Sequence, residues 1–266
     1  NGIRKGADTG LAGKKLMKAF IFGTAYIENP QRAELVQMWI ELNAYLNPEL
    51  PLVVVDSASD PIWRNMIPAL REIEIYTVKD GDALPPLRPG LNWIDFPENL
   101  GHPSTHGVDG WGRAFCRGIE IAIAQNYDYV VNIESDLLFR PKVMEVLQIQ
   151  QQKQIKFMTA WERTYGFMEN CICFMETRYL RDHGYIEKYG WHEQKKGAVL
   201  PEQHMENILR DELFIKPWMG FRDDFSKVQP EHLPHLDYLT HAHDHRLYYL
   251  FMQQIMPSGW QPPSQR

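Results

Sequence analysis

The chain has 266 residues, of which 44% are hydrophobic and 23% are charged, the balance of an ordinary globular protein with a substantial core. Its formal net charge of -6 argues against the basic face of a nucleic-acid-binding protein, so we expect no nucleic-acid partner. Three cysteines are too few for a disulfide framework, which favours a reducing, cytoplasmic location. The sequence contains no apolar run of the ~18–20 residues that a membrane span requires.

Strand-like and helix-like segments alternate along the chain after a polar, glycine-rich and basic start. Residues 1–16 are predicted to be a flexible leader or an expression remnant. The run 18–26 predicts a strand that ends in small residues, and apolar residues at helical spacing follow from 30 to 46. The apolar run 52–55 predicts a buried parallel strand with Asp56 at its carboxyl end. This alternation favours an α/β fold in one domain, with a mostly parallel central sheet flanked by helices.

The remaining elements continue this pattern. Spacing and apolar runs predict helices at 60–70, 111–124, 142–150, 177–183 and 202–213, and strands at 74–78, 93–96, 127–133, 155–160 and 169–175. Residues 99–112 contain four glycines and predict a ligand-shaped loop, and a loop rich in aromatics is expected beyond 213. Ligands of such sheets bind at the carboxyl ends of the strands, so Asp56 is either a binding residue or a solvated turn aspartate.

Glu134-Ser135-Asp136 follows the predicted strand 127–133 directly. Carboxylate oxygens suit hard cations such as Mg²⁺ and Mn²⁺, which commonly share one or two carboxylates with substrate phosphates. An acid-x-acid triplet is common by itself, and a solvated turn is the alternative. Its position at a strand end favours a metal site.

The motifs around this triplet resemble the donor half of the GT-A glycosyltransferases. That pattern is an Asn-x-Gly-like turn, a basic residue opening a helix, and a strand ending in the Asp-x-Asp (DXD) motif. Here it is matched by Asn99-Leu100-Gly101-His102, by Arg113, and by Glu134-Ser135-Asp136 with Glu as the first acid. Residues 168–180 are similar to the strand and helix that line the acceptor site in family-2-like enzymes of this fold. The resemblance covers about residues 18–210.

The resemblance implies a division of labour within one domain. Residues 17–140 would form the nucleotide-sugar donor-binding half, and residues 141–266 the acceptor-binding and metal-completing half. The donor site would comprise Thr24, Ala25, Tyr26 and Asp56 at the base or ribose, Arg113 at the diphosphate or sugar, Glu134 at the ribose or sugar or at the metal through water, Ser135 between the two acids, and Asp136 on the metal. Mn²⁺ or Mg²⁺ would neutralise the charge that develops on the leaving nucleoside diphosphate.

An inverting enzyme also needs a base for the acceptor hydroxyl. Family-2-like enzymes have a Glu-Asp pair where this chain has Glu202-Gln203, so the resemblance does not supply the base itself. Glu202 and Glu206 lie four residues apart on one face of the predicted helix, and we favour Glu202. An acid in the first helical turn also stabilises the helix dipole without any catalytic duty.

A histidine near the C-terminus completes the metal shell in many GT-A enzymes, and His241 or His243 resembles that ligand. If residues 241–245 were extended, their three histidines would point the same way. A polar surface segment is the alternative interpretation.

The sequence therefore predicts a metal-dependent hexosyl- or pentosyltransferase. It would move a sugar from a UDP- or GDP-sugar to a hydroxyl of a glycan or glycoconjugate, with inversion. The alternatives are a retaining GT-A enzyme, a nucleotidyltransferase, and a catalytically inactive module that binds nucleotide sugars. A nucleotidyltransferase usually carries a Gly-rich, basic signature after its first strand, and residues 23–28 contain no basic residue.

Overall fold

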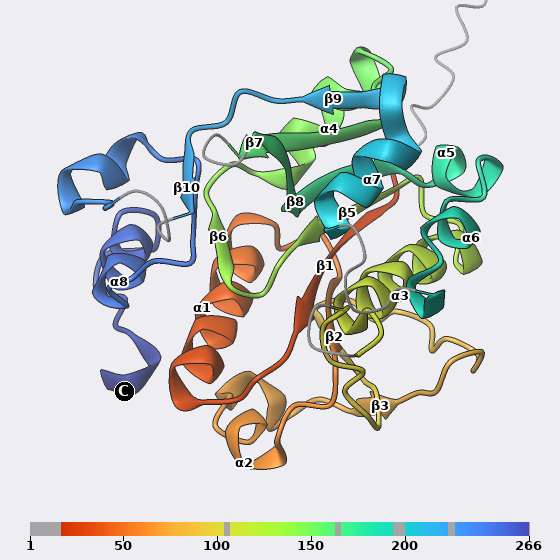
Figure 1. The fold of residues 1–266 in the computed structure, drawn as a ribbon. Coiled ribbons are helices and arrows are strands. Elements are labelled where there is room, and N and C mark those ends of the chain that lie inside the picture. The colour runs from red at the N-terminus through yellow and green to blue at the C-terminus, as the bar shows by residue number, and fades with distance from the viewer. Residues whose placement is uncertain (1–16, 104–106, 163–165, 194–199, 223–226, 266) are drawn as a thin grey trace, which may run out of the picture.

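The computed structural model describes residues 17–103, 107–162, 166–193, 200–222 and 227–265, so the predicted leader lies outside the described residues. An eight-stranded sheet forms the centre, in the order β3-β4-β2-β1-β5-β8-β7-β9, and a three-stranded sheet, β10-β11-β6, lies beside it (Figure 1). In the large sheet β8 runs antiparallel to β5 and β7, and the other pairs are parallel. The predicted α/β fold with a mostly parallel central sheet is confirmed.

The elements have the following bounds. The strands are β1 Ala19–Ala25, β2 Leu52–Asp56, β3 Ile75–Thr77, β4 Leu91–Asp95, β5 Tyr129–Ile133, β6 Leu137–Phe139, β7 Phe157–Glu162, β8 Phe167–Glu176, β9 Leu213–Ile215, β10 Gly220–Arg222 and β11 Tyr238–Thr240. The α-helices are α1 Pro30–Leu46, α2 Pro61–Arg64, α3 Gly110–Ala124, α4 Val143–Gln152, α5 Thr177–Asp182, α6 Tyr185–Tyr189, α7 Pro201–Leu209 and α8 Arg246–Gln253.

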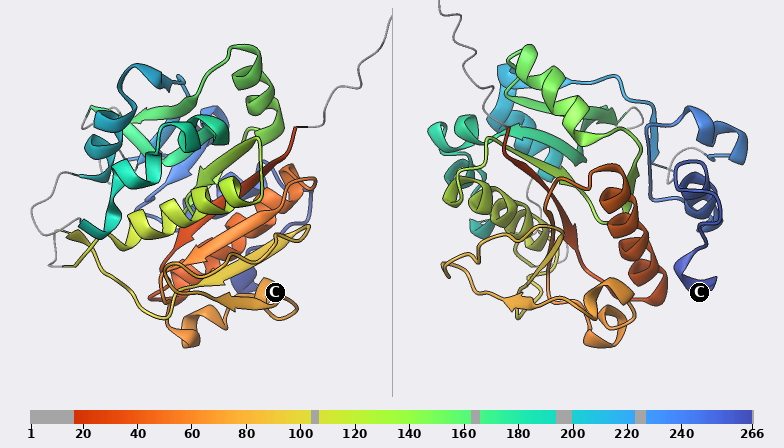
Figure 2. Two further views of the ribbon diagram at one scale, coloured as in Figure 1. Left: turned by 90° about the vertical axis from the view of Figure 1, so that its right-hand side faces the viewer. Right: turned by 180° about the vertical axis from the view of Figure 1, so that it is seen from behind.

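Helices cover both faces of the large sheet. Successive residues of a strand point to opposite faces. In β1, Ile21 belongs to the core that contains Trp39 of α1, whereas Phe20 and Phe22 belong to the core that contains Phe115 of α3. Figures 1 and 2 show α1 and α3 on opposite sides of β1. Burial of each such large side chain stabilises the fold by about 1.5–3 kcal/mol, so this two-sided packing holds β1 firmly at the centre.

The carboxyl end of β1 lies against β5 so closely that a side chain does not fit at Gly23. A Cβ there would lie 2.7 Å from the carbonyl oxygen of Ile133 and 3.1 Å from the Trp39 ring. One residue further on, the Ser135 hydroxyl donates a hydrogen bond to the Thr24 carbonyl at 2.7 Å. The small residues that end β1 therefore let the segment after β5 dock onto β1.

The small sheet joins the two halves that the sequence suggested. β6 comes directly after Asp136 and pairs antiparallel with β11, with Leu137 opposite Thr240. Residues 17–140 and residues 141–266 each contribute strands to both sheets. The acidic triplet after β5 is thereby tied to the C-terminal part of the chain.

The region from residue 213 onward is more regular than the predicted loop. It contains the three-residue strands β9, β10 and β11 and the helix α8, whose Phe251 and Met252 join the core on the α1 side. Strands of three residues are too short to give a periodic signal, which is why the sequence did not predict them. Among the described residues, the helices fall short of the length and apolar character that crossing a membrane requires.

Candidate active site

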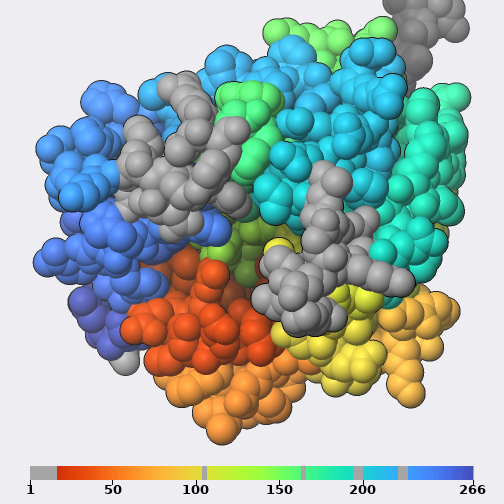
Figure 3. All heavy atoms as spheres, viewed as in Figure 1, coloured from red at the N-terminus to blue at the C-terminus, as the bar shows by residue number. Residues whose placement is uncertain are grey.

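A cavity of about 530 Å³ opens at the carboxyl ends of β1, β2 and β5. Its lining includes the predicted donor-site residues Thr24, Ala25, Tyr26, Glu134, Ser135 and Asp136, together with His241. Figure 3 shows a hollow in the middle of this face, between the red-orange atoms of α1 and the cyan atoms around α7. Open α/β sheets bind their ligands at this edge, so the cavity lies where the fold predicts a ligand.

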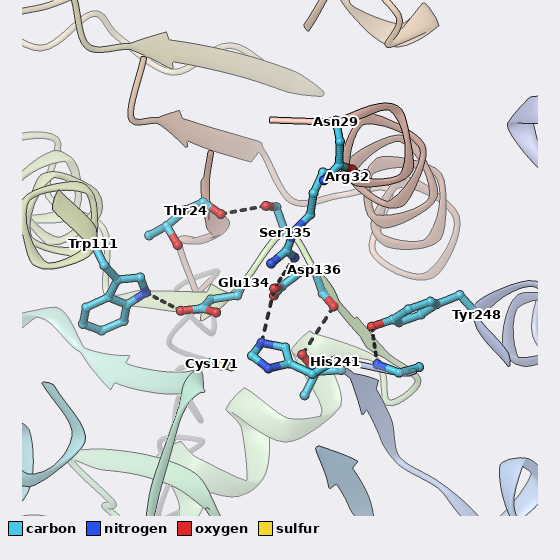
Figure 4. Close-up of polar contacts among 12 residues, drawn as sticks. Thr24, Asn29, Arg32, Trp111, Glu134, Ser135, Asp136, Cys171, His241 and Tyr248 are labelled. Carbon is cyan, nitrogen blue, oxygen red and sulfur yellow. Dashed lines mark hydrogen bonds and ion pairs between the residues drawn. The ribbon is translucent and has the colours of Figure 1, made fainter. Parts of the chain in front are cut away.

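Two side chains hold the Asp136 carboxylate. Nη1 of Arg32 lies 2.5 Å from Oδ2 of Asp136, and Nε2 of His241 lies 3.3 Å from the same oxygen. They approach the carboxylate from opposite sides (Figure 4). Burial by itself would raise the pKa of Asp136, but the hydrogen bond to His241 and the charge of Arg32 hold that pKa below its ordinary value. Asp136 is therefore ionised at neutral pH, as a metal ligand must be.

His241 reaches Asp136 because of the strand register. Thr240 ends β11 opposite Leu137, the first residue of β6, so the residues that flank this pair are neighbours. The Thr240 hydroxyl also donates a hydrogen bond to the Asp136 carbonyl at 3.4 Å. His241 has a φ of +51°, a left-handed conformation that costs a residue with a side chain about 1–2 kcal/mol. Such strain persists where the surroundings enforce it, often at functional sites.

The condition under which the three histidines of 241–245 would point the same way, an extended chain, is not met. The chain leaves the extended conformation at His241 and enters α8 at residue 246. His243 is exposed and borders a separate cavity beside α8. Nε2 of His245 lies 3.1 Å from Oε2 of Glu34 on α1. Of the two predicted metal ligands, the structure places His241 at Asp136 and His243 away from it.

Glu134 is held in place by the start of α3. Its Oε1 accepts a hydrogen bond from Nε1 of Trp111, and the Trp111 ring stacks on Phe115 with ring centroids 4.8 Å apart. α3 begins at Gly110, and the side chain of its N-cap residue, Asp109, accepts a hydrogen bond from the Gly112 amide at 2.7 Å. An aromatic side chain that is itself stacked fixes the orientation of the carboxylate it binds.

A second cavity, of about 370 Å³, adjoins the first. The two share His102, Trp111 and Glu134, so Glu134 lies at their junction. Asn170 of β8 and Glu202 in the first turn of α7 line the second cavity. A molecule in each cavity would meet the other at Glu134.

The two candidate bases on α7 differ in their surroundings. Glu202 faces the second cavity and is 8% exposed. Oε1 of Glu206 accepts a hydrogen bond from the Met168 amide at 2.6 Å, which ties α7 to β8. The structure therefore brings Glu202 to the site and gives Glu206 a contact that positions the helix.

Arg113 does not line either cavity. Its guanidinium stacks on the Phe96 ring at 3.9 Å from the centroid and donates a hydrogen bond to the Glu98 carbonyl at 2.5 Å. The side chain is only 2% exposed, and its nearest carboxylate is Asp80, with 4.0 Å between Nη1 and Oδ2. Its place in α3 turns it toward the loop after β4, although the sequence placed it at the donor.

Asp56 is fully buried and organises the turn after β2. Its Oδ1 accepts hydrogen bonds from the amide and hydroxyl of Ser59 at 3.0 and 2.5 Å. Oδ2 has no hydrogen-bond partner among the described residues and lies 4.0 Å from Nη1 of Arg64. Burial is the main cause that raises the pKa of Asp56 to about 6. Ser57, the next residue, lines the first cavity in its place.

The raised pKa of Asp56 predicts a pH-dependent effect of Asp56→Asn on stability. A carboxyl with a higher pKa in the folded than in the unfolded chain stabilises the fold at low pH, and this is lost as pH rises through about 6. From pH 4 to pH 7 the wild type should lose about 2 kcal/mol more unfolding free energy than the variant. Urea denaturation at several pH values measures this, and a difference that stays constant with pH contradicts it.

Arg32 is the residue of this site that sequence reasoning missed. It stands in the first turn of α1, where its amide donates a hydrogen bond to the capping side chain of Asn29 at 2.9 Å. The side chain is 40% exposed. A first-turn arginine usually belongs to the surface. The available signal was position, because a helix that starts directly after β1 directs its first turn to the edge where the sheet binds ligands.

The residues around Asp136 fit a divalent cation that shares its ligands with a diphosphate. Oδ1 of Asp136 is buried and has no hydrogen-bond partner among the described residues, while Oδ2 faces His241. Carboxylate and imidazole together suit Mn²⁺, and carboxylate suits Mg²⁺. Within the described ranges, no group of three or more His, Cys, Asp or Glu side chains converges to hold a metal. A cation here would take its remaining ligands from phosphate oxygens and water, as hard cations commonly do.

Solved glycosyltransferase structures share this architecture. No protein-family model and no curated protein sequence matches the chain. An active-site mutant of LgtC aligns with a TM-score of 0.56 at 12% identity, over 92% of this chain and 99% of LgtC. Galactosyltransferase LgtC in complex with donor and acceptor sugar analogs aligns with a TM-score of 0.52 at 10% identity, over 91% and 98% of the two chains. A glycosyltransferase involved in the glycosylation of the major capsid of PBCV-1 aligns with a TM-score of 0.51 at 10% identity, over 90% and 100%. The chain therefore has the GT-A fold of these glycosyltransferases.

Proposed function

We propose that the protein is a metal-dependent glycosyltransferase. It transfers a sugar from a nucleotide-sugar donor, linked to UDP or GDP, to a hydroxyl group of a glycan or glycoconjugate. The observation that supports this best is the Asp136 carboxylate. It is ionised, keeps one buried oxygen without a partner, and stands in a cavity of about 530 Å³ at the ligand-binding edge of a GT-A sheet.

The first cavity would hold the donor. Residues 24–26 would contact the base and ribose, and Asp136 with His241 would hold Mn²⁺ or Mg²⁺ at the diphosphate. When bound, the cation supplies Lewis-acid neutralisation of the leaving nucleoside diphosphate. Glu134, fixed by Trp111 at the junction of the two cavities, would orient the donor sugar toward the acceptor.

The second cavity would hold the acceptor. Glu202 is buried at its wall and would take the proton of the acceptor hydroxyl as that oxygen attacks the sugar. A base on the acceptor side is what a single displacement with inversion requires. We therefore propose inversion, and the anomeric configuration of the product tests it.

The test is turnover with a panel of UDP- and GDP-sugars in the presence of Mn²⁺. Release of the nucleoside diphosphate is expected from one donor, it should stop when EDTA removes the metal, and it should return when Mn²⁺ is added in excess. Binding of a nucleoside diphosphate without turnover of any donor would instead indicate an inactive nucleotide-sugar-binding module. Release of pyrophosphate from a nucleoside triphosphate and a sugar phosphate would indicate a nucleotidyltransferase.

A further inference from the structure

The Arg32 guanidinium lies at the Asp136 carboxylate oxygen that faces His241, where a metal held by Asp136 and His241 would lie. Nη1 of Arg32 and Nε2 of His241 lie 2.5 and 3.3 Å from Oδ2 of Asp136. Arg32 thus neutralises Asp136 while no other cation is bound. A guanidinium keeps its charge at every accessible pH, so this counter-charge is permanent.

The backbone of Arg32 is held in place, whereas its side chain is partly exposed to solvent. The hydrogen bond of its amide to Asn29 fixes the backbone in the first turn of α1. Its side chain is 40% exposed, against 13% for Asp136, and it lines the first cavity. The head group can therefore leave Asp136 by rotation of the side chain alone, without movement of the helix.

We propose that Arg32 couples metal binding to donor binding. In the empty site it is the counter-cation of Asp136, and when a divalent cation arrives with a nucleoside diphosphate, Arg32 transfers its contacts to the diphosphate. This inference rests on the proposed function. It adds that the metal and the nucleotide enter the site together.

Charge and geometry explain the coupling. A free cation at Asp136 meets the like charge of Arg32 and must displace it from the carboxylate into water. With a diphosphate in the same cavity, the displaced Arg32 guanidinium leaves the Asp136 carboxylate and binds phosphate oxygens instead. A planar guanidinium can bind such oxygens with two parallel hydrogen bonds. Arg32 therefore weakens the binding of the metal alone and strengthens the binding of the metal with the nucleotide. The same coupling acts on the nucleotide, because binding linkage is reciprocal.

The experiment measures the Mn²⁺ dissociation constant, from the electron paramagnetic resonance of free Mn²⁺, without nucleotide and with saturating UDP or GDP. The proteins are the wild type, Arg32→Gln, Arg32→Lys and the control Arg71→Gln, which changes an exposed arginine outside the cavity. Without nucleotide, Arg32→Gln should bind Mn²⁺ about fivefold more tightly than the wild type, since a charged hydrogen bond no longer competes. We divide the Mn²⁺ dissociation constant without nucleotide by the one with saturating nucleotide. In Arg32→Gln this ratio should be lower than in the wild type by about tenfold or more.

The other variants and outcomes separate the inference from the proposed function. Arg32→Lys keeps the charge and should stay near the wild type without nucleotide, and Arg71→Gln should match the wild type in both measurements. If Arg32→Gln binds Mn²⁺ no more tightly than the wild type, or keeps the wild-type ratio, the coupling role of Arg32 is wrong while the metal site stands. If the wild type binds no Mn²⁺ with either nucleotide, the proposed function itself fails.

Discussion

Asp136→Asn is expected to lower kcat/KM for sugar transfer by about 10³-fold, because Lewis-acid stabilisation of a leaving group contributes several kcal/mol and each 1.4 kcal/mol is a factor of ten. Asparagine keeps the size of the side chain and one carbonyl oxygen. It loses the negative charge that lies 3.3 Å from His241 Nε2 and 2.5 Å from Arg32 Nη1. The affinity for Mn²⁺ in the presence of a nucleoside diphosphate should fall in parallel with the rate.

Misfolding is separated from loss of the metal by the Tm of the variant and by a matched control. Asp211→Asn makes the same chemical change at an exposed position just after α7 and should behave as the wild type. An Asp136→Asn protein that keeps transfer activity, and in which that activity still disappears with EDTA, would show that the metal binds elsewhere.

The elements that end at the first cavity were predictable because their signals are local. Each strand that ends at the first cavity is rich in apolar residues and almost wholly buried, as strands in a parallel sheet covered on both faces are. Glu134 and Asp136 had to fall at the ligand edge once the strand before them was placed. The start of α1 was equally predictable, because Asn29 is a favoured N-cap residue and Pro30 is a favoured first helical residue.

The partners of Asp136 were not predictable in the same way, since they depend on contacts between distant segments. Arg32 and Asp136 are 104 residues apart, and the position of Arg32 in the first turn of α1 indicates the ligand-binding edge of the sheet but does not identify Asp136 as its partner. The choice between His241 and His243 depends on the register of β11 against β6 and on the left-handed backbone at His241. Strands of three residues are too short for a periodic sequence pattern, so neither this register nor this backbone conformation could be predicted.

Spacing along a helix shows which residues share a face, but the role of each residue also depends on what packs against that face. Glu202 and Glu206 share one face of α7, as their spacing predicted, but β8 binds Glu206 through the Met168 amide and leaves Glu202 at the cavity. Arg113 lies in the first turn of α3, two residues after Trp111, which lines the cavity. Two residues correspond to more than half a helical turn, so the two side chains face different surroundings.

Glu202→Gln is expected to lower kcat for transfer by about 10²- to 10⁴-fold, the range that a positioned general base contributes. Glu202 lines the second cavity and not the first, so the affinity for the nucleoside diphosphate should be unchanged. Glu206→Gln is the matched control, because it makes the same change one helical turn further along α7. Its amide oxygen can still accept the hydrogen bond from Met168, so its kcat should stay near that of the wild type.

The measurements are kcat, the dissociation constant of the nucleoside diphosphate, and the anomeric configuration of the product by NMR. Loss of kcat in Glu202→Gln alone, with an inverted product from the wild type, would establish Glu202 as the acceptor-side base. Equal losses in both variants would point to a structural role of α7. A product with retained configuration would remove the need for a base in the second cavity, and the decisive carboxylate would then be Glu134, which lies where the two cavities meet.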